Sequence, residues 1–98
     1  MTREEVIEKL KATESELRAL GIGELYLFGS YARGEATEDS DVDVLVTFGP
    51  QPGNRFRSFM TTRELLQDAV GRSVDVGTPA RFSVRVRQEI ERDAVRVF

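Results

Sequence analysis

Two aspartates separated by one residue open the most apolar run of the chain, Asp41-Val42-Asp43-Val44-Leu45-Val46. Side chains two residues apart on a strand point to the same face, so Asp41 and Asp43 are expected side by side. Two carboxylates at that distance raise each other's pKa unless a cation lies near them. Mg²⁺ prefers such oxygen ligands, together with substrate phosphates. The pair therefore predicts a metal site at the start of a buried strand.

A third aspartate, Asp75, lies in a later apolar segment and points away from the valines on either side of it. If segments 41–48 and 72–76 are neighbouring strands, the three carboxylates converge. Two metal ions held there would clamp the attacking and leaving oxygens of an in-line displacement at phosphorus. Because the chain contains no His, Asp75 is also the candidate base or metal ligand for an incoming hydroxyl.

A Gly-Ser turn precedes the aspartates and provides a candidate phosphate site. Gly29 lets backbone approach a ligand closely, and Ser30 begins a short helix whose free N–H groups favour phosphate. Arg33, one turn further on, has the charge to balance phosphate. Ser40 is a candidate phosphate donor or a cap at the strand entry. Triphosphate at the turn and metal at the aspartates would place the α-phosphorus between them.

Each of these features also has an ordinary structural interpretation. Gly-Ser turns are common, an Asp-X-Asp pair suits a solvent-facing strand edge, and Asp75 suits the wet side of a strand. Arg33 is typical of a surface, and Ser40 of a loop cap. The order of the features along the chain, rather than any one of them, favours a phosphoryl-transfer site.

Hydrophobic periodicity predicts the elements that must position these residues. Three helices are expected at 3–20, 55–70 and 83–92, the last capped by Ser83, with a short helix starting at Ser30. Strands are expected at 24–28, 41–48 and 72–76, and a Pro/Gly-rich connection at 49–54. The order αβαβαβα predicts an α+β fold in which a small mixed three-stranded sheet is packed with helices. Residues 1–98 are expected to form a single domain.

Composition excludes several classes of function. The chain has no Cys, so disulfides are excluded. A net charge of −3 argues against direct nucleic-acid binding. No apolar run approaches the roughly 20 residues needed to cross a bilayer, and the acidic N-terminus resembles neither a signal nor a transit peptide. These features predict a cytoplasmic protein without membrane association.

The motif as a whole resembles a known signature. Gly29-Ser30, ten residues, then Asp41-Val42-Asp43 matches the GSX10DXD pattern of the nucleotidyltransferase superfamily related to DNA polymerase β. The segments "LFGSYARGEATEDSDVDVLVTF" and "SVDVGTP" resemble the minimal nucleotidyltransferase (MNT) domain. That family includes the antitoxins of HEPN–MNT toxin–antitoxin modules, and the resemblance implies the nucleotidyltransferase fold.

The resemblance also implies an activity. Proteins of this kind use ATP and Mg²⁺, with two ions expected, to transfer AMP to a tyrosine of a partner HEPN ribonuclease toxin. Asp41, Asp43 and Asp75 would then be catalytic metal ligands, and Gly29 and Ser30, with Arg33, would hold the phosphates. The partner toxin implies a hetero-oligomer. Gly77 departs from the family pattern, in which a larger apolar residue often precedes Thr-Pro, and is expected to loosen the strand end beside Asp75.

Two other functions stay open at this point. The first is silencing of a partner by binding alone, through the amphipathic faces of the first and last helices. The second is transfer of a nucleotide to a hydroxyl of a small molecule, although related enzymes of that kind usually add a second domain for the acceptor.

Overall fold

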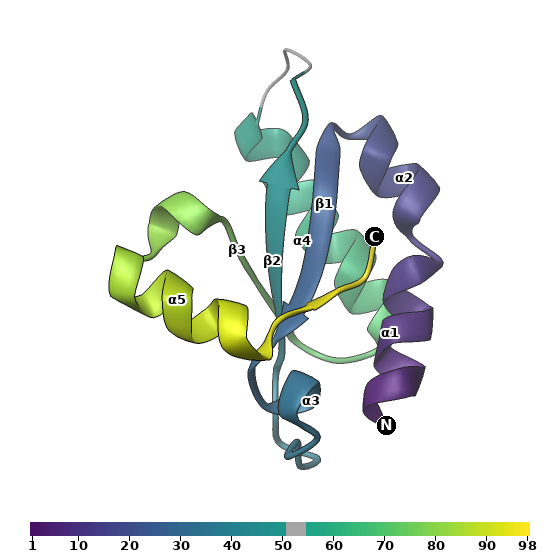
Figure 1. Cartoon of the computed structure of the whole chain (residues 1–98). Coiled ribbons are helices and arrows are strands. Elements are labelled where there is room, and N and C mark those ends of the chain that lie inside the picture. Colours follow the sequence, from purple (N-terminus) through teal and green to yellow (C-terminus); the bar gives the residue numbers. More distant parts are fainter. Residues whose placement is uncertain (51–54) are drawn as a thin grey trace.

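A computed structural model describes residues 1–50 and 55–98, which form a four-stranded mixed sheet with helices on both faces (Figure 1). The strand order is β3-β2-β1-β4. β1 is antiparallel to β2 and to β4, whereas β2 is parallel to β3. The strands are β1 (Ile22–Phe28), β2 (Val42–Phe48), β3 (Val74–Gly77) and β4 (Val95–Arg96). The predicted α+β fold with a mixed sheet is confirmed.

The core lies on one face of the sheet, beneath α1 (Arg3–Lys11), α2 (Glu14–Ala19) and α4 (Arg55–Val70). Alternation along the strands supplies the sheet's side of this core with leucines and valines. The helices supply Val6, Leu10, Leu17, Leu66 and Val70 to the same cluster. α5 (Val84–Asp93) lies over the opposite face, and none of its residues, all in the described part of the chain, is buried.

The first predicted helix, 3–20, is two helices in the structure. The chain turns at Thr13, whose Oγ1 donates to the carbonyl oxygen of Leu10 at 2.6 Å. Thr13 also directs its backbone N–H to the same carbonyl, at 3.1 Å, so the helical i→i−4 pattern is interrupted. A local bond from a threonine hydroxyl to the backbone competes with helix in this way. The apolar spacing continues through the break, which is why periodicity alone predicts one helix.

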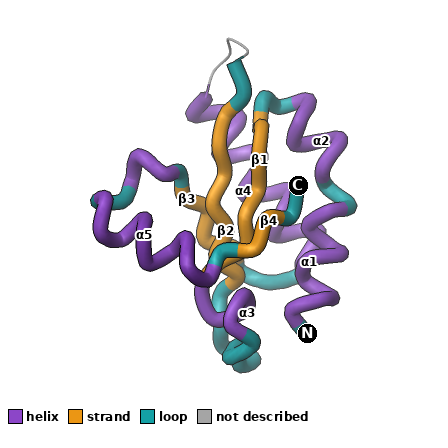
Figure 2. The backbone as a smooth tube through the Cα atoms, viewed as in Figure 1, coloured by secondary structure: helices purple, strands orange, loops and turns teal. Residues whose placement is uncertain are grey.

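The prediction of three strands is wrong by one strand. Val95 and Arg96 form β4, pairing with Leu27 and Tyr26 of β1 (Figure 2). The following backbone continues the attachment, since the N–H of Val97 donates to the carbonyl of Leu25 at 2.8 Å. A strand of two residues has no alternation to detect, so only the three-dimensional pairing reveals it.

The remaining boundaries agree with the sequence predictions within two residues. α4 begins and ends as predicted, and α5 is capped by Ser83, whose Oγ accepts from the N–H of Val86 at 3.3 Å. Residues 51–54 of the predicted connection lie outside the described residues. In the described ranges, every helix is too short or too polar to span a membrane.

Candidate active site

Parallel pairing of β2 with β3 places Asp43 directly opposite Asp75. Both aspartates alternate with buried valines, so they face away from the core. Neighbouring strands lie about 4.8 Å apart, which brings the two carboxylates within reach of one shared ligand. Asp41 immediately precedes β2 and is exposed, as is Asp75, whereas Asp43 is half-buried. The strands at 42–48 and 74–77 are thus neighbours, which is the condition for the three carboxylates to meet.

The surroundings of Asp43 disfavour its negative charge. Burial is the main cause that raises the pKa of the Asp43 carboxyl above its ordinary value, followed by the charges of Asp75 and Asp41. The positive charge of Arg33 acts in the opposite direction on that pKa but does not cancel the rise. Carboxylates with raised pKa values gather at functional sites. A divalent cation among the three aspartates would remove the repulsion.

The three aspartates suit Mg²⁺ in chemical type but do not yet surround a binding position. Across residues 1–50 and 55–98, no three acidic, His or Cys side chains are already arranged to hold a metal ion. Asp75 also forms an ion pair, since its Oδ1 accepts from Nη1 of Arg81 at 3.4 Å. The three carboxylates fit Mg²⁺ by the chemistry of their oxygens, and they would have to move closer together to hold it.

Gly29 joins β1 to the short helix α3 (Gly29–Arg33) and lies against Asp43. Its φ of +76° is in the left-handed region that favours glycine. A Cβ at this position would overlap Oδ2 of Asp43 and lie 3.1 Å from its Cγ. Glycine is therefore required for two reasons: the backbone has a positive φ, and Asp43 occupies the space that a side chain would need. Ser30 follows in the first turn of α3, beside the carboxylate cluster.

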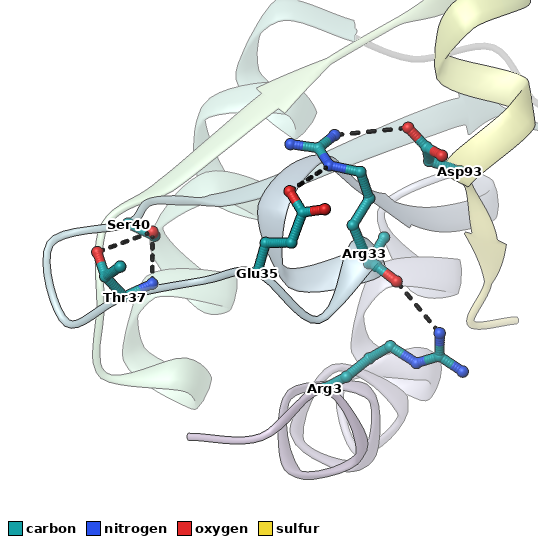
Figure 3. A network of polar contacts seen from close by, with 7 residues as sticks. Arg3, Arg33, Glu35, Thr37, Ser40 and Asp93 are labelled. Carbon is teal, nitrogen blue, oxygen red and sulfur yellow. Dashed lines mark hydrogen bonds and ion pairs between the residues drawn. The ribbon is translucent and has the colours of Figure 1, made fainter.

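Arg33 and Ser40 are both engaged within the protein (Figure 3). Nε of Arg33 donates to Glu35 at 3.2 Å, and its Nη1 reaches Asp93 of α5 at 3.5 Å. Arg33 also lines a cavity of about 300 Å³ with Gly29 and Asp93, between α3 and α5. The hydroxyl of Ser40 accepts from the N–H of Thr37 at 2.9 Å, so it closes the loop before β2. This bond is the loop cap, and the predicted contact of Ser40 with phosphate stays a prediction.

Two residues of this region were not singled out from the sequence. Arg81 ends the 3-10 helix η1 (Pro79–Arg81), and Asp93 lies in the last turn of α5. Arg81 reaches Asp75 and Asp93 reaches Arg33, so each pairs with a predicted site residue. Neither stands at a spacing that signals a site, because each contact depends on where η1 and α5 fold. The sequence offers no local signal for them.

The raised pKa of Asp43 predicts a pH-dependent stability effect in metal-free buffer containing EDTA. Folding raises this pKa above its ordinary value of 3.8, so folding favours proton uptake and the ionised Asp43 destabilises the fold at neutral pH. An Asp43→Asn variant should therefore unfold at a higher temperature than wild type at pH 7. The difference should shrink as pH falls through the folded pKa of Asp43 and should vanish below the unfolded value of 3.8, where this carboxyl is protonated in both states.

Thermal unfolding followed by circular dichroism between pH 4 and 8 measures this difference. Glu64→Gln, the same loss of one charge at an exposed position of α4, is the matched control. A stability gain for Asp43→Asn that stays constant across the pH range would contradict the electrostatic origin.

Comparisons with known proteins agree with this geometry. The nucleotidyltransferase domain family matches residues 4–97. The protein adenylyltransferase MntA of Thermococcus cleftensis is 38% identical over 98 residues, covering 99% of this chain and 97% of that protein. A solved structure of the minimal nucleotidyltransferase type superposes with a TM-score of 0.82 at 32% identity, over 97% of this chain and 95% of that one.

A more distant structure shares the fold. One chain of the complex between a tri-AMPylated HEPN toxin of Shewanella oneidensis and an MNT antitoxin aligns with a TM-score of 0.62 at 19% identity. The alignment covers 94% of this chain and 71% of that chain. The nucleotidyltransferase fold predicted from the signature is confirmed, and this chain belongs to the nucleotidyltransferase domain family, as an enzyme that transfers nucleotidyl groups.

Proposed function

We propose that this chain is an antitoxin that transfers AMP from ATP to a tyrosine of a HEPN ribonuclease toxin and thereby silences it. The apposition of Asp43 and Asp75, with Gly29 against Asp43, supports the proposal most directly, because it brings predicted metal and phosphate residues next to one another. The name of the Thermococcus relative supports a protein as acceptor. The Shewanella complex supports a HEPN partner and hence a hetero-oligomer. We place the reaction in the cytoplasm, where ATP and Mg²⁺ are available.

In this proposal the carboxylates hold metal and the turn holds phosphate. Asp41, Asp43 and Asp75 would bind Mg²⁺, two ions in the full site, and bound Mg²⁺ neutralises the charge that develops on the phosphate oxygens. Gly29 leaves room for the nucleotide's phosphates, and Ser30 offers its hydroxyl. Arg33, already lining the cavity beside Gly29, would exchange its bond to Asp93 for the phosphates.

The transfer itself makes one bond and breaks another. The tyrosine oxygen bonds to the α-phosphorus, the bond from that phosphorus to the oxygen bridging the β-phosphate breaks, and pyrophosphate leaves. The tyrosine proton passes to a carboxylate of the same cluster, since the chain has no His to accept it. Catalysis then consists of positioning and charge stabilisation, as in phosphoryl transfer generally.

The position of the label in ATP tests the proposal directly. The chain is incubated with Mg²⁺ and a candidate HEPN protein, using ATP labelled either on the α- or on the γ-phosphate. Only α-labelled ATP should mark the HEPN protein, and peptide mass spectrometry should place AMP on a tyrosine. Labelling from γ-labelled ATP would indicate phosphorylation instead, and no labelling by either would contradict a protein acceptor. EDTA should abolish the transfer.

Exposed apolar side chains favour a second candidate, silencing by binding alone. Phe56 and Val84 are 75% and 62% exposed, and both lie on helices that a partner is able to reach. If binding suffices, an inactive variant will still neutralise the toxin at normal expression. If transfer is required, that variant will leave the toxin active.

A further inference from the structure

Arg81 forms an ion pair with Asp75. Its Nη1 lies 3.4 Å from Oδ1 of Asp75, and both side chains are more than half exposed. Asp75 stands opposite Asp43, so this ion pair lies at the edge of the proposed metal site. A guanidinium and a divalent cation are alternative partners for the same carboxylate. A metal ion bound at Asp75 would therefore weaken or replace the contact with Arg81.

The position of Arg81 is fixed by its neighbour in sequence. The guanidinium carbon lies 5.6 Å from the centroid of the Phe82 ring, a stacking arrangement favourable to arginine. The Phe82 ring in turn meets the edge of Phe28, with centroids 6.3 Å apart. Phe28 directly precedes Gly29, so the ring on which Arg81 stacks packs beside the residue that leads into the Gly-Ser turn.

Gly77 makes the space for this arrangement. A Cβ at Gly77 would lie 3.1 Å from Cε2 of Phe82, closer than packed side chains normally approach. Gly77 is nevertheless part of β3 and pairs with Leu45, so the strand end beside Asp75 remains paired. The missing side chain thus admits the ring that carries Arg81.

We propose that Arg81 is a built-in counter-ion of the site: it holds Asp75 until metal binds, and then turns to the phosphates of the nucleotide. This inference rests on the proposed role of Asp75 as a metal ligand. Once the metal takes Asp75, the guanidinium stays on the Phe82 ring with its donors free. A planar guanidinium matches phosphate oxygens with paired hydrogen bonds. Arg81 would therefore oppose metal binding alone and favour nucleotide binding.

Arg81→Gln, which removes the charge but keeps a polar side chain, tests the two opposite effects of Arg81 on metal affinity and on nucleotide affinity. Mn²⁺ alone, followed by its electron paramagnetic resonance signal, should bind about two- to fivefold more tightly, the usual strength of an exposed ion pair. An ATP analogue with a methylene between the α- and β-phosphorus, measured by calorimetry with Mg²⁺, should bind about tenfold more weakly. Arg85→Gln, on the 89% exposed Arg85 of α5, should change neither affinity.

Asp75→Asn separates failure of this inference from failure of the proposed function. If Asp75→Asn weakens Mn²⁺ binding but Arg81→Gln leaves it unchanged or weaker, the counter-ion role of Arg81 is overturned and the metal site stands. If Asp75→Asn has no effect on Mn²⁺ binding, Asp75 is not a metal ligand, and both the counter-ion role of Arg81 and the proposed metal site at Asp75 are overturned. Phe82→Leu is a second variant that keeps the charge of Arg81. It should shift both affinities in the same directions as Arg81→Gln, by smaller factors, and unchanged affinities would overturn the role of the ring.

Discussion

An Asp43→Asn variant is expected to transfer AMP about a thousandfold more slowly than the wild-type chain while remaining folded. Asp43 is the central carboxylate of the proposed site, with Asp75 across the strand pair and Gly29 against its Oδ2. An amide has one neutral oxygen in place of a charged pair, so the variant would lose much of the metal's contribution. That contribution is worth several kcal/mol, and about 1.36 kcal/mol changes a rate tenfold.

The measurement is the initial rate of α-labelled AMP incorporation into the HEPN protein at saturating ATP and Mg²⁺. Glu64→Gln again provides the matched loss of one carboxylate, at a position of α4 outside the site. It should transfer AMP at the wild-type rate. Equal rates for Asp43→Asn and wild type would show that Asp43 holds no catalytic metal.

The same variant tells apart transfer and binding as the means of silencing. Asp43 is a half-buried residue of β2, whereas Phe56 and Val84 are among the exposed apolar residues available to a partner. Asp43→Asn should therefore keep its affinity for the HEPN protein in a pull-down. Loss of neutralisation together with retained binding is the outcome that the transfer proposal requires.

The strands that carry the site were predictable from the sequence because their patterns are local. Alternation along 42–48 puts Asp43 on the opposite face from the valines, and the same rule orients Asp75. The turn at Gly29 was predictable for a similar reason, since it interrupts an apolar run. What the sequence left conditional was the pairing of the two strands. Residues 49–73 separate them, and no local pattern fixes which strands become neighbours.

The features that the sequence did not predict are ion pairs between distant elements and very short elements. Arg33 pairs with Asp93 across 60 positions, and such a contact depends on how α5 crosses the sheet. The pair between Arg81 and Asp75 spans only six positions, but it requires the turn of η1. The chain has 14 Lys and Arg residues, so charge alone does not indicate that Arg33 and Arg81 form these two ion pairs. Their roles follow from geometry.

A Gly29→Ala variant is expected to lose about a hundredfold in transfer rate, from a single added methyl group. The new Cβ would overlap Oδ2 of Asp43 and push that carboxylate from its position opposite Asp75. Displacing a catalytic group by about 1 Å commonly costs about a hundredfold in rate. The variant should also be destabilised by about 1–2 kcal/mol, because alanine at φ +76° is strained.

Gly34→Ala is the control that separates strain from collision. Gly34 ends the same short helix at φ +73°, and an added Cβ there meets no atom within 4 Å in the described structure. It should therefore lose a similar amount of stability, measured by urea unfolding, but keep most of its transfer rate. Comparing the two alanines at matched fractions folded isolates the effect on Asp43.

The decisive quantity is the ratio of the two transfer rates once stability is equal. If Gly29→Ala and Gly34→Ala were equally active, the contact between Gly29 and Asp43 would not matter for chemistry. A large deficit confined to Gly29→Ala would tie the rate to the position of one carboxylate. Mn²⁺ affinity gives an independent reading, because a displaced Asp43 should weaken metal binding in Gly29→Ala and leave it intact in Gly34→Ala.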